Sequence, residues 1–309
     1  MQSIKSRVFY HLVKYQLSKL ARLSLPLPEY RLAREAAASR IFKMPSGISV
    51  EACSISYCEG EWLRRTEGTS KGIVLYLHGG AYTGGSCITH RALAATIAKM
   101  TKANVFNLGY RLAPEHPFPA ALEDAVRTYQ AISNKHPQTP IAICGDSAGA
   151  GLALATAIEL RDQQVNKPVC LALMSPWTDL ALTNETHRTK AAVDPYFPTT
   201  ERLTNARHYA GDTELTHPLI SPQYATVHDL PPTLIHVGSL EALLQDSLTI
   251  AANMTAQGSN ATVKIFPGMW HVWQTLHSRI KEADQSLEEL AEFMQTHFVS
   301  HAIPTSTDA

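Results

Sequence analysis

Charge of one sign is what this sequence most clearly lacks. Its 309 residues include 27 lysines and arginines and 27 aspartates and glutamates, so the formal net charge at pH 7 is zero. A balanced chain creates no field that attracts polyanions, and we therefore expect no nucleic-acid partner. The chain also lacks an apolar run long enough to span a bilayer.

Paired cysteines are missing as well. The five cysteines form no C-x-x-C pair and no Cys/His cluster with zinc spacing, so we expect no metal site. Their odd number and scattered positions favour reduced thiols and a cytoplasmic location. Cys144 and Cys170 lie in apolar runs and are expected in the core.

The N-terminal segment Met1 to Leu27 is basic, with no acid before Glu29. His11 and Lys14 interrupt its apolar residues, which excludes a signal peptide. Those apolar residues recur with helical spacing at Ile4, Val8, Phe9, Leu12, Val13 and Leu20. A basic amphipathic helix can lie on a membrane surface. We favour a helix packed on the protein body instead, because most apolar stripes of this kind face a core.

From about residue 73 onward, apolar runs alternate with helical patterns. The predicted strands are Ile73–Leu77, Asn104–Leu108, Ile141–Cys144, Val169–Met174, Thr233–Val237 and Thr262–Phe266. The predicted helices are Arg91–Met100, Ala120–Ile132, Ala148–Arg161, Ala242–Ala256 and Lys281–Gln295. The alternation predicts an α/β fold, with a mostly parallel sheet covered by helices on both faces.

Two segments do not follow the alternation. Residues 1 to about 44 precede the first strands, and residues 183–217 separate the fourth predicted strand from the fifth. Functional groups collect at the carboxyl ends of parallel strands. We therefore predict one domain over residues 1–309, with a lid over that edge of the sheet built from these two segments.

The sequence GDSAG at 145–149 follows a predicted strand and precedes a predicted helix. A strained strand-to-helix turn of this G-x-S-x-G type exposes a serine nucleophile, which makes Ser147 the candidate. Asp146 has two interpretations that the sequence leaves open. It either holds a neighbouring loop through hydrogen bonds or caps the following helix.

The sequence HGG at 78–80 supplies a second part of the same chemistry. Acyl transfer creates an oxyanion that preorganised N–H groups stabilise. Ala148 follows the nucleophile and is one candidate donor, and Gly79 and Gly80 are the others, because glycine lets the backbone approach a ligand closely. Tyr82 is a candidate for the pocket wall.

A serine nucleophile of this kind needs a histidine base that follows it in the chain. Nine histidines follow Ser147: besides His301 near the end of the chain, they are His187, His208, His217, His228, His236, His271, His277 and His297. His271 is favoured because it lies on a loop just after a predicted strand. The acid that orients the base should follow strand 233–237, where Glu241 and Asp246 are available. We favour Glu241, since Asp246 lies further into the next helix.

Taken together, these motifs resemble the bacterial hormone-sensitive lipase family of esterases. The resemblance covers nearly the whole chain: HGG at 78–80, YRLAPEHPFPAA at 110–121, GDSAG at 145–149, SPWTDL at 175–180, LPP at 230–232 and GMWHVW at 268–273. It implies an α/β-hydrolase fold, a nucleophile at Ser147, a base at His271 and an acid at Glu241. It also implies hydrolysis of short- to medium-chain carboxylic esters without a cofactor. Two positions depart from the family pattern, Ala150 for a frequent glycine and Gln245 for a frequent acid.

The natural substrate stays open at this point. EWL at 61–63 and MWHVW at 269–273 look similar to a branch of lactone hydrolases, and a lactone opens through the same intermediate. Either a small ester or a lactone is therefore expected. Asp194, Tyr196 and Phe197 either line its pocket or pack within the lid. Receptors related to this family lose the histidine, which argues against a binding-only role here. A homodimer is left open.

Overall fold

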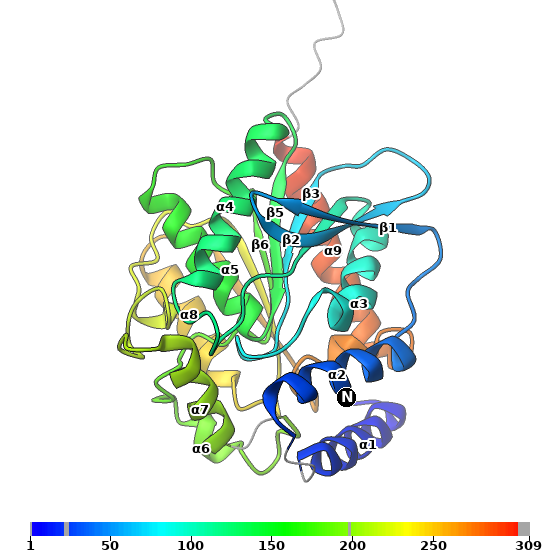
Figure 1. Ribbon diagram of the computed structural model, residues 1–309, viewed down its shortest axis with the longest axis vertical. Helices are drawn as coiled ribbons and strands as arrows, with labels where there is room; N and C mark the ends of the chain where they lie inside the picture. Colours follow the sequence, from blue (N-terminus) through cyan, green and yellow to red (C-terminus); the bar gives the residue numbers. More distant parts are fainter. Residues whose placement is uncertain (1, 22–24, 197–198, 302–309) are drawn as a thin grey trace, which may run out of the picture.

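An eight-stranded sheet runs through the computed structural model, which describes residues 2–21, 25–196 and 199–301 (Figure 1). The strand order is β1-β2-β4-β3-β5-β6-β7-β8. Strand β2 runs antiparallel to both of its neighbours, β1 and β4, and all other neighbouring strands are parallel. The strands are β1 (Ile48–Ile55), β2 (Cys58–Arg65), β3 (Ile73–Leu77), β4 (Asn104–Leu108), β5 (Ile141–Asp146), β6 (Leu171–Met174), β7 (Thr233–Gly238) and β8 (Ala261–Phe266).

Helices cover both faces of this sheet. The α-helices are α1 (Ile4–Ala21), α2 (Leu27–Ile41), α3 (Cys87–Thr101), α4 (Ala120–Lys135), α5 (Ala148–Asp162), α6 (Thr186–Thr189), α7 (Thr199–Ala210), α8 (Leu244–Ala256) and α9 (Lys281–His301). Helices α4, α5 and α8 lie on one face, and α3 and α9 lie on the other (Figure 1). The predicted α/β class, with a mostly parallel sheet between two helical layers, is confirmed.

The central strands are apolar throughout because both of their faces are buried. Along β3, Leu75 and Leu77 pack into the core beneath α4 and α5. Val74 and Tyr76 point the other way, into the core formed with α3 and α9. Side chains of a strand alternate between faces, so a strand between two helical layers needs apolar residues at nearly every position.

The hairpin β1–β2 was not predicted. Both strands precede the first predicted strand, and β1 forms the edge of the sheet with mostly exposed or half-buried residues. In β2 the buried side chains include Trp62 and Leu63, with charged residues on both sides of them. An edge hairpin of this kind has no long apolar run, so its sequence does not stand out as a strand pair.

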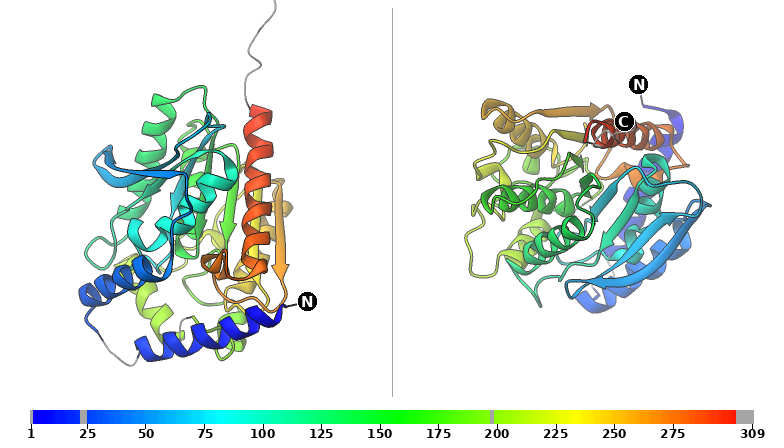
Figure 2. Two further views of the ribbon diagram at one scale, coloured as in Figure 1. Left: turned by 90° about the vertical axis from the view of Figure 1, so that its right-hand side faces the viewer. Right: turned by 90° about the horizontal axis from the view of Figure 1, so that it is seen from above.

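Four helices gather at the carboxyl ends of the parallel strands. Helices α1 and α2 lie there beside α6 and α7, which come from the segment between β6 and β7 (Figures 1 and 2). We call this group of four helices the cap. Its position agrees with where the two non-alternating segments were expected, whereas opening and closing as a lid stays a prediction.

Helix α1 packs on the body through one face only. Phe9 and Val13 pack against the cluster around Trp270 and Trp273, as predicted. Ile4, Val8 and Leu12 are instead exposed, so the expectation that the whole stripe faces a core is wrong for these three. They lie on the opposite side of the helix from Val13, because a helix turns by about 100° per residue. The side chain of Leu20 lies outside the described part of the structure.

No described helix is both long and apolar enough to cross a bilayer.

Candidate active site

Ser147 occupies a sharp turn between β5 and α5. Its backbone has φ 55° and ψ −122°, a conformation that side-chain-bearing residues rarely adopt. Gly149 makes the turn feasible, because a Cβ there would lie 2.0 Å from the carbonyl oxygen of Leu77 in β3. The strained turn leaves the Ser147 hydroxyl at the carboxyl edge of the sheet, beneath the cap.

Three side chains from separate loops form a hydrogen-bonded chain at this edge. The Oγ of Ser147 lies 2.9 Å from Nε2 of His271, and Nδ1 of His271 lies 2.9 Å from Oε2 of Glu241. A carboxylate only accepts hydrogen bonds, so Nδ1 donates to Glu241 and Nε2 is left to accept from the serine hydroxyl. All three residues are buried. The structure therefore brings together the nucleophile, base and favoured acid predicted from the sequence.

Glu241 is itself held in place from two sides. Its Oε1 accepts hydrogen bonds from the Ser175 hydroxyl at 2.8 Å and from the backbone N–H of Gly238. Burial lowers the pKa of His271, but the hydrogen bond and charge of Glu241, together with Asp194, outweigh burial and raise that pKa above its usual 6.5. The acid thus favours the imidazolium that forms when His271 takes a proton.

Asp146 holds the HGG loop and does not cap α5. Its Oδ1 accepts hydrogen bonds from the backbone N–H of Gly79 at 3.0 Å and from the Tyr76 hydroxyl at 2.6 Å. Burial opposes ionisation of this carboxyl, but His90 and these hydrogen bonds outweigh it and lower the pKa of Asp146. Asp146 is buried behind the loop and lines neither of the two cavities described below, so its contacts support the role of holding the loop, whereas its predicted role in substrate binding stays a prediction.

The N–H group of Gly79 is therefore already in use, which corrects its assignment as an oxyanion donor. The next two residues turn sharply: Gly80 has φ 128°, and a Cβ there would lie 2.2 Å from the carbonyl oxygen of Gly84. Within the described residues, the backbone N–H groups of Gly80, Ala81 and Ala148 have no hydrogen-bond partner. Ala81 also lines the cavity beside Ser147. Sequence reasoning missed Ala81 because an alanine carries no signal of a donor role.

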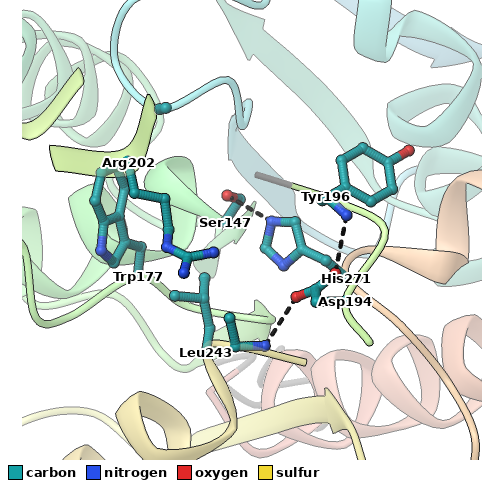
Figure 3. A pocket seen from close by; sticks show the side chains of 9 residues that line it. Ser147, Trp177, Asp194, Tyr196, Arg202, Leu243 and His271 are labelled. Carbon is teal, nitrogen blue, oxygen red and sulfur yellow. Dashed lines mark hydrogen bonds between the residues drawn. The ribbon is translucent and has the colours of Figure 1, made fainter. Parts of the chain in front are cut away.

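A small cavity lies directly beside Ser147 and His271 (Figure 3). Its volume is about 10 Å³, which is room for about one water-sized group. Trp177, Arg202 and Leu243 close one side of it, while Tyr196 lies on the other side of the imidazole. Trp177 belongs to a motif of the family resemblance, but Arg202 and Leu243 reach the site only through packing of α7 and the loop before α8.

Asp194 and Tyr196 connect the cap to this site. The carboxylate of Asp194 accepts hydrogen bonds from the backbone N–H groups of Ala242 at 2.8 Å and Tyr196 at 3.0 Å. Burial raises the pKa of Asp194 to about 6, although nearby His271 opposes the shift. The Tyr196 ring approaches the His271 ring edge-on, with centroids 5.6 Å apart. Both residues line the cavity beside Ser147, and their role in binding substrate stays a prediction. Phe197 lies outside the described residues.

A groove of about 730 Å³ shares two lining residues, Asp194 and Tyr196, with the small cavity. Helices α1 and α2 and the loop after β3 line it, together with the cap segment around Tyr196. Tyr82 lines neither cavity: it is buried, and its ring stacks on Tyr209 with centroids 3.6 Å apart. Its assignment to the pocket wall is wrong because its side chain turns into the core.

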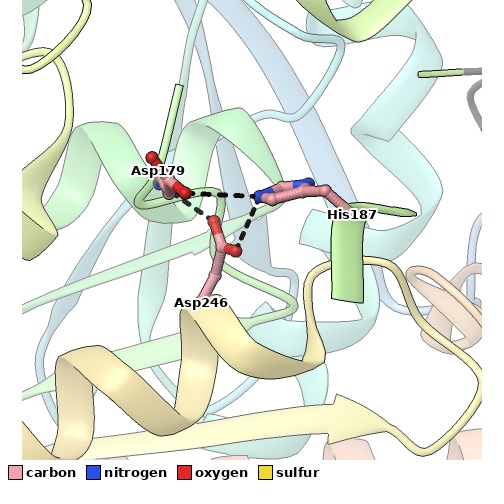
Figure 4. Close-up of side chains that lie close together, drawn as sticks. All are labelled: Asp179, His187 and Asp246. Carbon is pink, nitrogen blue, oxygen red and sulfur yellow. Dashed lines mark hydrogen bonds and ion pairs between the residues drawn. The ribbon is translucent and has the colours of Figure 1, made fainter. Parts of the chain in front are cut away.

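Asp246, the rejected acid, lies in a separate buried cluster (Figure 4). One of its oxygens pairs with Nε2 of His187 at 2.9 Å, and the other accepts hydrogen bonds from the backbone N–H groups of Thr178 and Asp179. Asp179, His187 and Asp246 are the one group among the described residues whose ligand atoms lie close enough to hold a metal ion, within 4.8 Å of one another. Because the contacts of Asp246 already join α6, α8 and the loop after β6, we assign the cluster a structural role.

Comparisons with known proteins agree with this geometry. A family model described as alpha/beta hydrolase fold matches residues 74–275. An acetyl-hydrolase of Streptomyces hygroscopicus is 36% identical over 80% of this chain and 82% of its own length. An esterase of Acinetobacter venetianus is 34% identical over 82% of this chain and 84% of its own.

Two crystal structures are similar over almost the whole chain. A hormone-sensitive lipase from a metagenome library superimposes with a TM-score of 0.91 at 34% identity, covering 96% of this chain and 99% of its own. EstE5 soaked with p-nitrophenyl butyrate gives a TM-score of 0.85 at 37% identity, covering 93% and 99%.

Proposed function

The chain belongs to the alpha/beta hydrolase fold family, among the carboxylic ester hydrolases of the bacterial hormone-sensitive lipase type, and from this premise we propose that Ser147, His271 and Glu241 are its catalytic triad. The observation that carries the proposal is the chain of two 2.9 Å contacts from the serine hydroxyl to the buried carboxylate. A serine hydroxyl becomes a useful nucleophile only when a positioned base takes its proton.

The reaction follows from these positions. Oγ of Ser147 attacks the ester carbonyl carbon while Nε2 of His271 takes the hydroxyl proton, and the carbonyl oxygen becomes an oxyanion. The N–H groups of Gly80, Ala81 and Ala148 stabilise that charge. The alcohol leaves with the proton from His271, which yields an acyl-enzyme. A water molecule then repeats the sequence, and the carboxylic acid and free Ser147 are released.

Short acyl groups fit this site best. The cavity beside Ser147 accommodates about one water-sized group, which corresponds to the methyl of an acetyl ester. The larger groove then receives the alcohol part. One of the relatives is an acetyl-hydrolase, which supports a small pocket for the acyl group. Lactones would open by the same steps, but the relatives are named esterases and acetyl-hydrolases, so linear esters are the proposed substrates.

We also propose a cytoplasmic location for the protein and a lid role for the cap. The five cysteines are free thiols, which supports a reducing, cytoplasmic environment. The four cap helices lie where substrate would enter, which supports a lid role for the two non-alternating segments.

Hydrolysis of p-nitrophenyl esters tests the assignment. The wild type should hydrolyse the acetate ester, and Ser147→Ala should reduce kcat by at least about 10⁴-fold, because no other group replaces the nucleophile. Ser300→Ala, at an exposed serine of α9, is the matched control and should behave like wild type. An active Ser147→Ala enzyme would show that the nucleophile is elsewhere.

Acyl-chain length tests the proposed pocket separately. The wild-type kcat/KM should fall from acetate through butyrate to laurate, and ε-lactones should be poorer substrates than acetate esters. A maximum at long chains would mean that the groove, and not the small cavity, holds the acyl group.

A further inference from the structure

The outer face of α1 carries an apolar stripe that the active site does not use. Ile4, Val8, Leu12 and Tyr15 are 81, 62, 48 and 63% exposed. At about 100° per residue these four side chains fall within a sector of about 80° along one side of the helix. Single exposed apolar residues need no explanation, but an aligned row of them marks an interaction surface.

The opposite face of α1 already packs on the protein body, so the exposed stripe is not the face by which this helix joins the core. Phe9 and Val13 pack against the body. The Tyr10 hydroxyl donates a hydrogen bond to the carbonyl oxygen of Val193 at 2.6 Å. At the start of the helix, the backbone N–H of Ser3 donates to the carboxylate of Glu282 at 2.6 Å. These contacts fix which side of the helix faces outward.

The charged residues beside the stripe indicate what kind of partner it would bind. Lys5 follows the stripe on one side and Arg7 lies on the other, while α1 contains no acidic residue. Lys14, next to Arg7 around the helix, donates a hydrogen bond to the carbonyl oxygen of Ala192 at 3.0 Å and so belongs to the attachment of α1 to the body. An apolar stripe between cations is the pattern of helices that lie in the interface of anionic membranes. A second copy of this chain would bring the same cations together around the stripe, which disfavours self-association through this face.

We infer that the outer face of α1 docks on an anionic lipid surface. The apolar stripe enters the boundary between headgroups and acyl chains, and Lys5 and Arg7, one on each side of it, lie against lipid phosphates. The same helix lines the groove through Lys14 and Leu17. Docking would therefore place the substrate groove within about one helix diameter, roughly 10 Å, of a surface where lipophilic esters accumulate.

Vesicle flotation of the full-length protein tests this inference. Vesicles of phosphatidylcholine alone are compared with vesicles containing equal parts of phosphatidylcholine and phosphatidylglycerol. The wild type should float with the anionic vesicles, several-fold less with the neutral ones, and less again at about 0.5 M salt. The double variant Val8→Ser/Leu12→Ser should weaken partition by about tenfold or more, because two apolar side chains no longer leave water.

The matched control is Val299→Ser, which removes an equally exposed apolar side chain from α9 at the other end of the molecule (Figure 1). It should float like wild type. All of these proteins should hydrolyse a water-soluble acetate ester equally, so loss of vesicle binding is distinguishable from failure of the proposed catalytic site.

Three results would overturn the inference. The first is a wild type that stays out of the anionic vesicle fraction. The second is a Val8→Ser/Leu12→Ser variant that partitions as strongly as wild type. The third is a wild-type dimer in sedimentation that this variant dissociates without any vesicle binding, which would assign the stripe to a second copy of the chain.

Discussion

At the scale of single residues, the chemistry of the site concentrates on the His271 imidazole. Its two nitrogens contact the nucleophile and the acid at the same distance, 2.9 Å. Glu241 decides which nitrogen carries the proton, and without that choice Nε2 could not accept the proton of Ser147. In the proposed triad, we therefore expect the position of the Glu241 carboxylate to control the reactivity of Ser147 on another loop.

Replacing Glu241 by glutamine should show separately what Glu241 contributes by orienting His271 and what it contributes by its charge. An amide can donate to Nδ1 and favour the wrong tautomer, so kcat should fall by roughly 10²- to 10⁴-fold. The carboxylate also raises the pKa of His271. Its loss should lower that pKa, so the residual activity should persist to lower pH than in wild type. A pH profile of kcat/KM measures both effects.

Glu288→Gln, at an exposed position of α9, is the control for Glu241→Gln and should leave the profile unchanged. Full activity of Glu241→Gln, with an unmoved acid limb, would contradict the role of Glu241 as the triad acid.

At the scale of elements, the cap is joined to the body by polar contacts in its interior. His187 comes from α6 in the cap, and Asp246 comes from α8, which packs on the sheet. Asp246 also accepts backbone hydrogen bonds from the loop after β6, so three segments meet at one carboxylate (Figure 4). A buried carboxyl group with this many hydrogen-bonding partners resists displacement of any of the three segments.

Removing His187 should loosen this junction. His187→Ala takes away one hydrogen-bonding partner of the buried Asp246 carboxylate, and losing the partner of a buried polar group costs about 1–3 kcal/mol of the free energy of unfolding. Urea unfolding followed by circular dichroism measures the loss. His208→Ala, at an exposed histidine of α7, should change the free energy of unfolding by less than about 0.5 kcal/mol. Equal stability of the two variants would rule out a structural role for the cluster.

At the scale of the whole molecule, stability should depend on pH through histidines that are buried in the neutral form. Burial lowers the pKa of His236 in β7 to about 4, and burial together with His90 lowers that of His78 to about 3. In the unfolded chain both titrate near 6.5. The unfolded state thus binds more protons below pH 6.5, and stability falls as pH decreases from that value toward 4. His271, whose pKa is raised, acts in the opposite direction.

This dependence can be measured with one substitution. Between pH 7 and pH 5, His236 should account for about 2 kcal/mol of lost unfolding free energy. His236→Gln should therefore show a pH 7 to pH 5 difference smaller than that of wild type by about this amount, whatever its stability at pH 7. Urea titrations at the two pH values give both numbers. An unchanged difference would mean that His236 does not carry the effect.

Most of the site could be predicted because its signals are local in sequence. G-x-S-x-G dictates a strand-to-helix turn through its own glycines, and His271 and Glu241 each follow an apolar strand. Parallel strands end at one edge of a sheet, so residues that follow them meet there without any knowledge of side-chain packing. Among the histidines that follow Ser147, His271 then stood out by its position on a loop just after a predicted strand.

Other features depended on contacts that no local pattern records. The N–H of Gly79 is lost to Asp146 only because the loop after β3 folds against the end of β5, and this shift makes Ala81 the proposed donor. Tyr82 turns inward because Tyr209 of the cap is there to stack on it. The edge hairpin β1–β2 was not predicted because it has no long apolar run.

The sequence by itself determined the layered α/β fold and the residues proposed as nucleophile, base and acid, since periodicity and turn chemistry act within a few residues. Only the tertiary structure decided which amides point into the oxyanion site, how small the cavity beside Ser147 is, and which apolar face of α1 stays exposed. Helical spacing shows that α1 has apolar residues on more than one side, but the surface that Phe9 and Val13 cover exists only once β8 and α9 have packed together. Orientation and exposure are properties of the assembled molecule, because each depends on what occupies the neighbouring space.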